Sequence, residues 1–265
     1  MNEIEPSKAE TAARSGAARQ RVVMRALLAG LILSLLANFF LVRANEEYFK
    51  QVSAVRLDPP GLKFYATQRA VPPPQNRPVV AFFGDSRALM WALPKGLPNA
   101  ELRDLGVGNQ TTAQVLLRFD DDVARLKPKV VVLEAGVNDL KTIAEFPSAK
   151  RETIETCKSN LARLVAKARK IDASVVLVTV FAIGDVSIWR RPFWSSEIGP
   201  AVDEVNRFVR TLGQDGVVVL DADPILDDAR GKIDPRYQYD FLHLAPAGYA
   251  ALNERLVPIV QSLLH

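Results

Sequence analysis

From residue 77 onward, apolar positions along the chain follow two alternating patterns. Some stretches are short, continuous and rich in valine, such as PVVAFFG and KVVVLEAG, which is typical of strands buried on both faces of a sheet. In the stretches between them, apolar residues recur every three or four positions, as on one face of a helix. We predict strands at residues 78–84, 101–105, 129–136, 174–181 and 216–223, and helices at 115–126, 154–168, 202–212 and 249–263.

This alternation of strands and helices predicts an α/β fold. Each helix carries the chain back to begin a neighbouring strand, so the strands run parallel and helices cover both faces of the sheet. We therefore expect a three-layer α/β/α sandwich around a roughly five-stranded parallel sheet. Ligands bind such sheets beyond the carboxyl ends of the strands, which is where functional residues are expected.

A different pattern occupies the N-terminal part, where residues 26–42 contain no charged side chain. At about 1.5 Å per residue these positions make a helix of roughly 26 Å, at the short end of what spans a bilayer. Basic residues precede the segment, which predicts a cytoplasmic N-terminus and a catalytic domain outside the cytoplasm, in the periplasm if the source is a Gram-negative bacterium. The alternative is a cleaved signal peptide that ends near Val42-Arg43-Ala44.

The chain is thus expected to have four parts. Residues 1–25 form a basic cytoplasmic tail, and residues 26–42 form a transmembrane signal anchor. Residues 43–76 include Pro59-Pro60 and Pro72-Pro73-Pro74, so we expect a stalk that is partly extended. Residues 77–265 form the folded domain.

Composition excludes several classes of function. Among 265 residues, 48% are hydrophobic, 24% are charged and the net charge is only +4, without a basic stripe interleaved with aromatic residues, so nucleic acid is not expected as a partner. Cys157 is the single cysteine and cannot form an internal disulfide. With two histidines, the chain has no Cys/His cluster at metal-ligand spacing, and we expect no metal.

Four short polar motifs follow strand ends or precede the last helix. Each alone is common in turns, but together they supply the parts of an acyl-transfer site. Asp240 and His243 are three residues apart, so the carboxylate can hold one imidazole nitrogen while the other faces the Ser86 hydroxyl. Donors for a developing oxyanion could be the Asn138 amide and the backbone N–H groups of Ser86 and the Gly108-Asn109 bend. The motifs are Gly84-Asp85-Ser86, Gly106-Val107-Gly108-Asn109, Gly136-Val137-Asn138-Asp139 and Asp240-Phe241-Leu242-His243.

These motifs, in this order, resemble the four sequence blocks of the SGNH (GDSL) hydrolases, over about residues 77–265. The resemblance implies a flavodoxin-like fold, no cofactor, Ser86 as nucleophile with Asp240 and His243, and Asn138 as an oxyanion donor. The second block differs from the family pattern, because Asn109 stands where glycine is usual and Gly108 comes one residue earlier. Either residue could supply the backbone N–H. Gln110-Thr111-Thr112 is similar to the acetylhydrolase-like branches of the family.

The segment after the fourth strand concentrates aromatic and basic side chains. Trp189, Phe193 and Trp194 could line a substrate pocket or grip an anionic or sugar substrate, together with two arginines. The alternative is a loop that packs over the sheet edge.

Together these features predict a membrane-anchored serine esterase that hydrolyses short O-acyl groups, such as acetyl, of a small ester, a lipid or a glycan. One alternative is an O-acyltransferase that uses the same site on envelope polysaccharide. Another is a non-catalytic anchored scaffold, against which the complete set of Ser86, Asn138, Asp240 and His243 argues.

Overall fold

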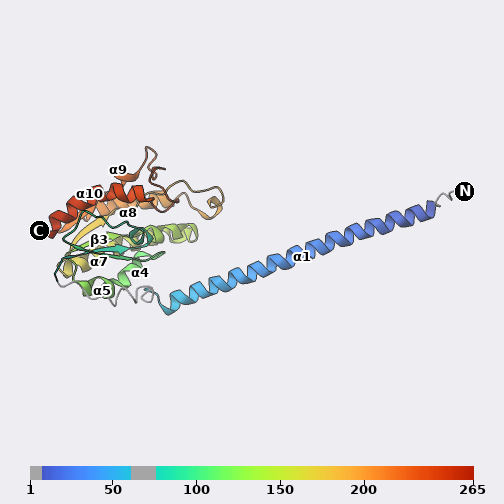
Figure 1. Cartoon of the computed structure of the whole chain (residues 1–265), viewed down its shortest axis with the longest axis horizontal. Helices are drawn as coiled ribbons and strands as arrows, with labels where there is room; N and C mark the ends of the chain where they lie inside the picture. Colours follow the sequence, from blue (N-terminus) through green and yellow to red (C-terminus); the bar gives the residue numbers. More distant parts are fainter. Residues whose placement is uncertain (1–7, 61–75) are drawn as a thin grey trace. The chain divides into compact units, whose positions relative to one another are not determined.

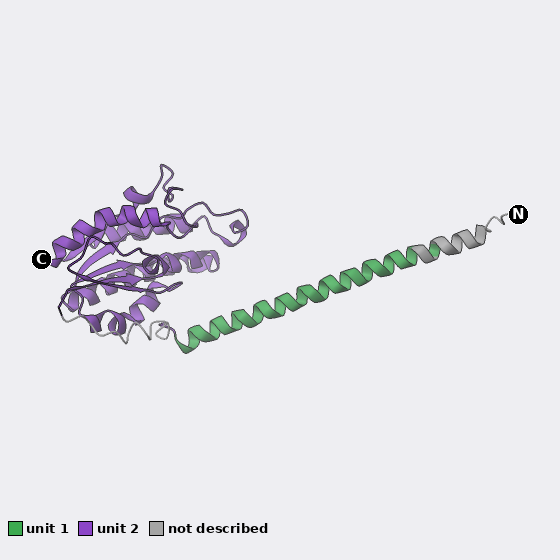
Figure 2. Cartoon of the chain, in the orientation of Figure 1, with its two compact units in different colours: residues 1–58 green, residues 59–265 purple. Residues whose placement is uncertain are grey.

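The computed structural model describes residues 8–60 and 76–265, which divide into two compact units (Figure 2). The first unit, residues 1–58, is built on one helix, α1 (Lys8–Leu57), and the second comprises residues 59–265. Within the described residues, one helix, in the stretch Arg19–Leu57, is long and apolar enough to cross a membrane. A signal sequence near the N-terminus would share both properties.

Helix α1 continues well beyond the apolar segment. Residues 43–57, which we expected to belong to the stalk, are helical up to Leu57. No proline occurs between Pro6 and Pro59, and Lys50 pairs with Glu46 and Glu47 at helical spacing, so the helix ends only where the prolines begin. The expected extended segment at residues 72–74 lies outside the described residues.

The second unit contains one sheet of five parallel strands, as predicted from the valine-rich runs (Figure 1). The strand order is β2-β1-β3-β4-β5, so the chain reverses direction across the sheet between β1 and β3, where parallel α/β sheets bind their ligands. Every residue of β1 and β3 is buried, which explains why both strands are apolar apart from Glu134 at the end of β3. The strands are β1 (Val79–Gly84), β2 (Glu101–Gly106), β3 (Val130–Glu134), β4 (Ser174–Val178) and β5 (Val217–Leu220).

Helices pack on both faces of this sheet, which makes the three predicted layers. Ala81 and Phe83 of β1 face a core built with α4, α5, α7 and α8, whereas Val80 and Phe82 face a core built with α9 and α10. The helices of this unit are α3 (Ser86–Leu89), α4 (Thr112–Leu117), α5 (Phe119–Asp122), α6 (Val137–Leu140), α7 (Lys150–Lys170), α8 (Ile198–Thr211), α9 (Asp223–Leu226) and α10 (Pro246–Leu264). Short 3-10 turns are η2 (Ala124–Leu126), η3 (Lys141–Ala144), η4 (Pro147–Ala149) and η5 (Arg191–Phe193).

One predicted helix is interrupted. The apolar spacing over residues 115–126 predicted a continuous helix, but the structure has α4, α5 and η2 in succession. The break falls at Arg118, whose backbone leaves helical geometry and whose side chain is completely buried. The guanidinium donates to backbone carbonyls at the ends of β1 and β2, and those bonds draw the chain inward at this point.

The strand register brings the functional motifs together. Gly84 pairs with Gly106 on one side and with Glu134 on the other, so the carboxyl ends of β1, β2 and β3 lie at the same level. A Cβ atom on Gly84 would come within 1.7 Å of the Glu134 carbonyl oxygen, and one on Gly106 within 2.0 Å of the Leu89 nitrogen. Only glycine permits β1 to lie this close to β3 at Gly84, and β2 to lie this close to α3 at Gly106.

Candidate active site

A chain of hydrogen bonds links three of the predicted site residues. The Ser86 Oγ lies 2.9 Å from Nε2 of His243, and Nδ1 of His243 lies 2.9 Å from Oδ2 of Asp240. Ser86 follows β1 directly and begins α3, whereas Asp240 and His243 lie in the loop before α10. The structure therefore brings together residues that are more than 150 positions apart in the sequence.

The Asp240 carboxylate is held by its own loop. Its Oδ1 accepts the backbone N–H groups of Leu242 at 2.7 Å and His243 at 2.8 Å. Partial burial acts to raise the pKa of Asp240, but the hydrogen bonds from the His243 ring and from these two N–H groups outweigh it, and the pKa is lowered. The carboxylate thus stays ionised beside the imidazole, where it can fix the ring and its tautomer.

Ser86 is displayed at the start of a short helix that Asp85 caps. The buried Asp85 carboxylate accepts the backbone N–H of Arg87 at 2.9 Å, so Asp85, rather than the serine, is the N-cap. The Ser86 hydroxyl is therefore not used as a cap and is available to His243.

Apart from Ser86 itself, the predicted oxyanion donors come from α6 and from the segment between β2 and α4. Asn138 is buried in the first turn of α6, and its Nδ2 donates one hydrogen to the Gln110 carbonyl at 3.0 Å, so its amide plane is fixed and a second hydrogen remains. Among the described residues, the backbone N–H groups of Ser86, Gly108 and Asn109 have no backbone or side-chain acceptor. Such unpaired donors are what an oxyanion site requires.

The bend at Gly108-Asn109 shows how asparagine occupies the place where glycine is usual. Asn109 has φ of 63°, in the left-handed region, which asparagine adopts more readily than most residues. The backbone conformation demanded by the motif is thus formed by Asn109, and a Cβ on Gly108 would meet no atom within 4 Å.

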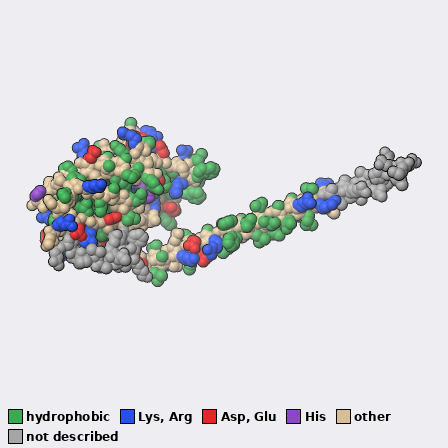
Figure 3. Space-filling model, viewed as in Figure 1, with side chains coloured by type: hydrophobic (Ala, Val, Ile, Leu, Met, Phe, Trp, Pro, Cys, Tyr) green, Lys and Arg blue, Asp and Glu red, His purple; other side chains and the backbone are tan. Residues whose placement is uncertain are grey.

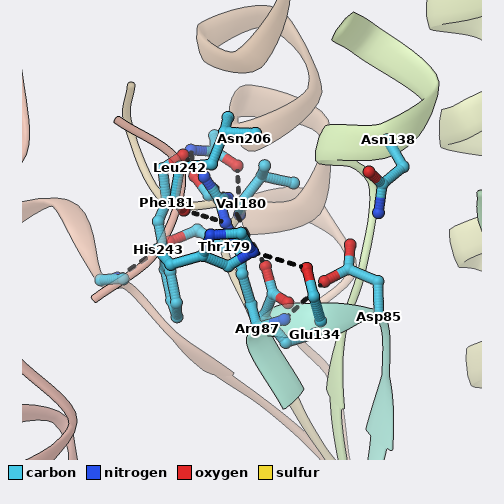
Figure 4. Close-up of polar contacts among 12 residues, drawn as sticks. Asp85, Arg87, Glu134, Asn138, Thr179, Val180, Phe181, Asn206, Leu242 and His243 are labelled. Atoms are coloured by element: carbon cyan, nitrogen blue, oxygen red, sulfur yellow. Dashed lines mark hydrogen bonds and ion pairs between the residues drawn. The ribbon is translucent and has the colours of Figure 1, made fainter. Parts of the chain in front are cut away.

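Arg87 is fully buried and reaches the loop Asp240–His243, here called the histidine loop (Figure 4). Its Nε donates to the Leu242 carbonyl at 2.8 Å, and its Nη1 donates to the Phe181 carbonyl at 3.0 Å. Nη1 also lies 3.7 Å from Oε1 of the buried Glu134. One side chain therefore connects the helix that carries Ser86, the end of β3, the segment after β4 and the loop that carries His243.

The two carboxyl groups near Arg87 are unusually basic. Burial and the neighbouring Asp85 raise the pKa of Glu134 well above its ordinary value. Burial also raises the pKa of Asp85, although the charge and backbone N–H of Arg87 oppose it. The positive charge of Arg87 therefore offsets part of the free-energy cost of burying the carboxyl groups of Asp85 and Glu134.

A second buried arginine, Arg118, holds the oxyanion side. It donates to the Gly84 carbonyl at 2.6 Å and to the Leu105 carbonyl at 2.8 Å, and its Nε lies 2.5 Å from Oε1 of Gln110. The Gln110 amide nitrogen in turn donates to the Pro60 carbonyl at 2.9 Å. The loop that presents Gly108 and Asn109 is therefore fastened to the ends of β1 and β2 and to the segment at Pro60.

Asp139, next to Asn138, has a supporting role. Its carboxylate accepts the backbone N–H of Thr112 at 2.8 Å and the Thr112 hydroxyl at 2.6 Å, which joins α6 to the start of α4. Burial raises its pKa to about 6 in spite of these hydrogen bonds.

Of the three aromatic residues expected in a pocket, Trp194 differs from the other two in its surroundings. Trp194 packs edge to face on Phe241 of the histidine loop, with 5.1 Å between ring centroids, and lines a cavity of about 570 Å³. Trp189 and Phe193 are 85% and 80% exposed and do not line it. Neither Ser86 nor His243 lines this cavity, which lies between the segment after β4 and α8.

The described part of the chain contains no group of three His, Cys, Asp or Glu side chains placed to hold a metal ion.

Comparison with known families decides the classification. The model of the GDSL-like lipase/acylhydrolase family matches residues 67–251, which include all four motifs. The chain belongs to this family. The resemblance noted in the sequence is confirmed, and the match also supports the predicted enzyme class, a carboxylic ester hydrolase.

Individual relatives of this family are distant. The chain is 28% identical to platelet-activating factor acetylhydrolase IB subunit alpha1 of Pongo abelii over 162 residues, which are 61% of this chain and 64% of that protein. A GDSL-like lipase structure from Bacteroides thetaiotaomicron superposes with a TM-score of 0.63 at 22% identity, over 77% of this chain and 98% of that one. An acetylxylan esterase variant from Geobacillus stearothermophilus superposes with a TM-score of 0.54 at 17% identity, over 71% and 94%.

Reasoning from the sequence missed the residues that hold the site together, namely Arg87, Glu134, Gln110 and Arg118. A signal was present for two of them. Arg87 follows the nucleophile inside an apolar stretch, and Glu134 is the only charged residue in a run of valine and leucine. An isolated charge in a buried element needs a buried partner, so these two residues could have been paired.

Proposed function

We propose that this chain is a membrane-anchored serine esterase that hydrolyses short O-acyl esters. The observation that carries the proposal is the hydrogen-bonded chain from Ser86 through His243 to Asp240 at the carboxyl end of β1. Family membership supports the same reaction class.

In the proposed reaction Ser86 Oγ attacks the acyl carbon while Nε2 of His243 accepts the hydroxyl proton. Asp240 stabilises the imidazolium that forms, and its bonds to the His243 backbone keep it in place. Negative charge that develops on the carbonyl oxygen is stabilised by Asn138 Nδ2 and by N–H groups of Ser86 and of Gly108 or Asn109. His243 then protonates the departing alcohol, and a water molecule, deprotonated by His243, releases the acyl group as a carboxylate.

The acyl group that we propose is short, with acetyl as the first choice. A relative is named as an acetylhydrolase of platelet-activating factor, and a protein of the same fold is named as an acetylxylan esterase. These names cover a lipid and a glycan, so they support the acetyl group rather than a particular alcohol.

We further propose that α1 anchors the enzyme and that the catalytic unit lies outside the cytoplasm. The uncharged segment at residues 26–42 supports the anchor, and the arginines before it support the orientation. Externally added protease should digest the catalytic unit in intact spheroplasts. Digestion only after lysis would reverse the orientation, and release of the catalytic unit as a soluble product would indicate a cleaved signal.

The esterase proposal is tested with the full chain in detergent micelles and nitrophenyl esters of increasing acyl length. Ser86→Ala should abolish turnover, and acetate esters should be cleaved fastest. Ser262→Ala, which changes an exposed serine on α10, is the matched control and should turn over normally. Turnover by Ser86→Ala at the rate of the unchanged chain would refute the serine mechanism. Adding a glycan acceptor and analysing whether acetate or an acetylated glycan forms separates hydrolysis from acyl transfer.

A further inference from the structure

The segment Val186–Ser196, here called the aromatic loop, exposes an unusual set of side chains. Ile188, Trp189 and Phe193 are 67%, 85% and 80% exposed, which is costly for residues of this size. Figure 3 shows hydrophobic side chains gathered, with basic ones beside them, at one end of the catalytic unit. A concentrated apolar surface of this kind indicates an interaction site.

The base of this loop is fixed to the histidine loop. Trp194 packs on the Phe241 ring, the Arg190 guanidinium lies 5.0 Å from the centre of the same ring, and the Gly184 N–H donates to the Phe241 carbonyl at 2.9 Å. Pro192 stiffens the 3-10 turn η5 at the tip. The exposed side chains are therefore held outward by a stiff, anchored loop and do not fold back onto the domain.

The charges of the aromatic loop are all positive. Arg190 and Arg191 have no acidic partner among the described residues, and Val186–Ser196 contains no acidic residue. The acids that flank the loop are already paired: Asp185 contacts Lys232 and Arg230, and Glu197 contacts Lys150. Two arginines among exposed aromatic residues therefore face solvent without local neutralisation.

This combination fits an anionic lipid surface better than other occupants. Tryptophan and phenylalanine enter the boundary between headgroups and acyl chains, and nearby arginines are attracted to a negatively charged leaflet. A sugar-binding surface commonly combines aromatic rings with carboxylate or amide side chains that bind hydroxyl groups, and the aromatic loop has no carboxylate or amide side chain. The chain also carries a helix apolar enough to cross a membrane, which would keep such a surface permanently nearby.

We propose that the aromatic loop inserts Ile188, Trp189 and Phe193 into an anionic lipid surface while Arg190 and Arg191 contact phosphate groups. This inference goes beyond the esterase reaction and rests on the membrane anchor proposed above. Phe241 lies between Asp240 and His243 in sequence and contacts Trp194 and Arg190 of the aromatic loop. Binding of the aromatic loop to lipid would therefore act directly on the segment that carries His243. The enzyme would then act on esters at the membrane surface.

Tryptophan fluorescence provides the test, because the three tryptophans, at positions 91, 189 and 194, all lie in the catalytic unit. The full chain carrying Ser86→Ala is reconstituted in vesicles of phosphatidylcholine alone or with phosphatidylglycerol. The lipids are used with and without bromine near the headgroup end of their acyl chains. The emission of Trp189 is obtained by subtracting that of the same chain with Trp189→Phe.

In the vesicles that contain phosphatidylglycerol, bromine should remove roughly half of the Trp189 emission, as expected for a side chain in the headgroup and upper acyl region. Quenching should be weaker in phosphatidylcholine alone and in the double variant Arg190→Gln/Arg191→Gln. As a matched control, Leu117→Trp in the Trp189→Phe chain places an exposed tryptophan on α4 and should not be quenched.

Three results would overturn the proposal. The first is equal Trp189 emission with and without bromine. The second is equal quenching of the Leu117→Trp control, which would indicate adsorption of the whole domain. The third is a change of Trp189 emission on adding acetylated xylan oligosaccharides without quenching by lipid, which would indicate a glycan surface. Since every chain in the test carries Ser86→Ala, none of these results depends on esterase activity, so the two proposals can fail separately.

Discussion

The histidine side and the oxyanion side of the site are each fastened by one buried arginine, but they differ in which hydrogen bonds already exist. On the histidine side, Ser86, His243 and Asp240 are joined at 2.9 Å between successive partners. On the oxyanion side, the backbone N–H groups of Ser86, Gly108 and Asn109 meet no acceptor among the described residues.

This difference matches the time at which each side acts. The proton path must exist before the serine attacks, so its groups are bonded to one another in the resting enzyme. In the proposed reaction, the oxyanion donors stabilise a charge that appears only in the transition state, and donors already hydrogen-bonded within the protein could not do so. Arg87 and Arg118 hold the two sides in register without entering the reaction.

The largest expected effect comes from breaking the proton path. Asp240→Asn keeps a side chain of the same size but removes the charge and the fixed tautomer of His243, and kcat should fall by about 10⁴ by analogy with serine proteases. Steady-state kinetics on acetyl esters measures the loss. The accompanying Ser86→Ala/Asp240→Asn variant should be no worse than Ser86→Ala alone, because residues that act as one unit are not additive. A single-variant loss below tenfold would remove Asp240 from the proton path.

The next effect should come from the oxyanion side. Asn138→Ala removes one prepositioned donor, so kcat should fall by about 10²- to 10³-fold while KM changes little. Asn138 also donates to the Gln110 carbonyl, so the variant could lose stability as well as activity. Thermal unfolding of the same preparation measures the loss of stability separately from the loss of kcat. A variant that is destabilised but fully active would limit Asn138 to a structural role.

A pH experiment tests the support beneath the oxyanion side. The folded-state pKa of Asp139 is raised to about 6 from 3.8, so the folded protein holds this proton more tightly than the unfolded chain. The resulting stabilisation is fully present below pH 3.8 and is lost as the pH rises through 6. It amounts to about 3 kcal/mol in the free energy of unfolding. Asp139→Asn should flatten that part of the pH dependence in urea unfolding, and an unchanged slope between the two pH values would contradict the assignment.

The smallest effects should distinguish the two arginines. Lysine cannot make the several directed bonds of the buried guanidinium, so Arg87→Lys and Arg118→Lys should each lower kcat roughly tenfold through misplacement of the groups they hold. Arg87 donates to the Leu242 carbonyl beside His243, whereas Arg118 donates to carbonyls at the ends of β1 and β2, so Arg87→Lys should move the limb of the pH–rate profile that reports the histidine more than Arg118→Lys does. Equal pH profiles for both variants would mean that the two sides are not held independently.

The predictability of these parts from sequence follows from how local each signal is. The strands are visible because a strand buried on both faces must be apolar throughout, as at Val79–Gly84. Asp240 and His243 are visible because they stand three positions apart in one turn. Ser86 could then be assigned to the same site because it directly follows β1, and ligands bind beyond the carboxyl ends of parallel strands.

The bonds that Arg87 and Arg118 donate to backbone carbonyls could not be predicted in the same way. Each guanidinium bonds backbone carbonyls, which every residue possesses, so no residue type marks the partner in the sequence. Arg118 also interrupts a helix whose apolar spacing continues undisturbed on either side. The bonds from Arg118 to distant backbone carbonyls therefore interrupt the helix, although the local apolar spacing predicts a continuous one.

The central claim is that His243 activates Ser86 as a nucleophile, and covalent labelling tests it most directly. A fluorophosphonate probe is added to the full chain, and the modified peptide is identified by mass spectrometry. We expect a single labelled residue, Ser86, and labelling that is lost in His243→Ala but normal in Ser262→Ala. Labelling of a different residue, or labelling of Ser86 at an unchanged rate in His243→Ala, would contradict it.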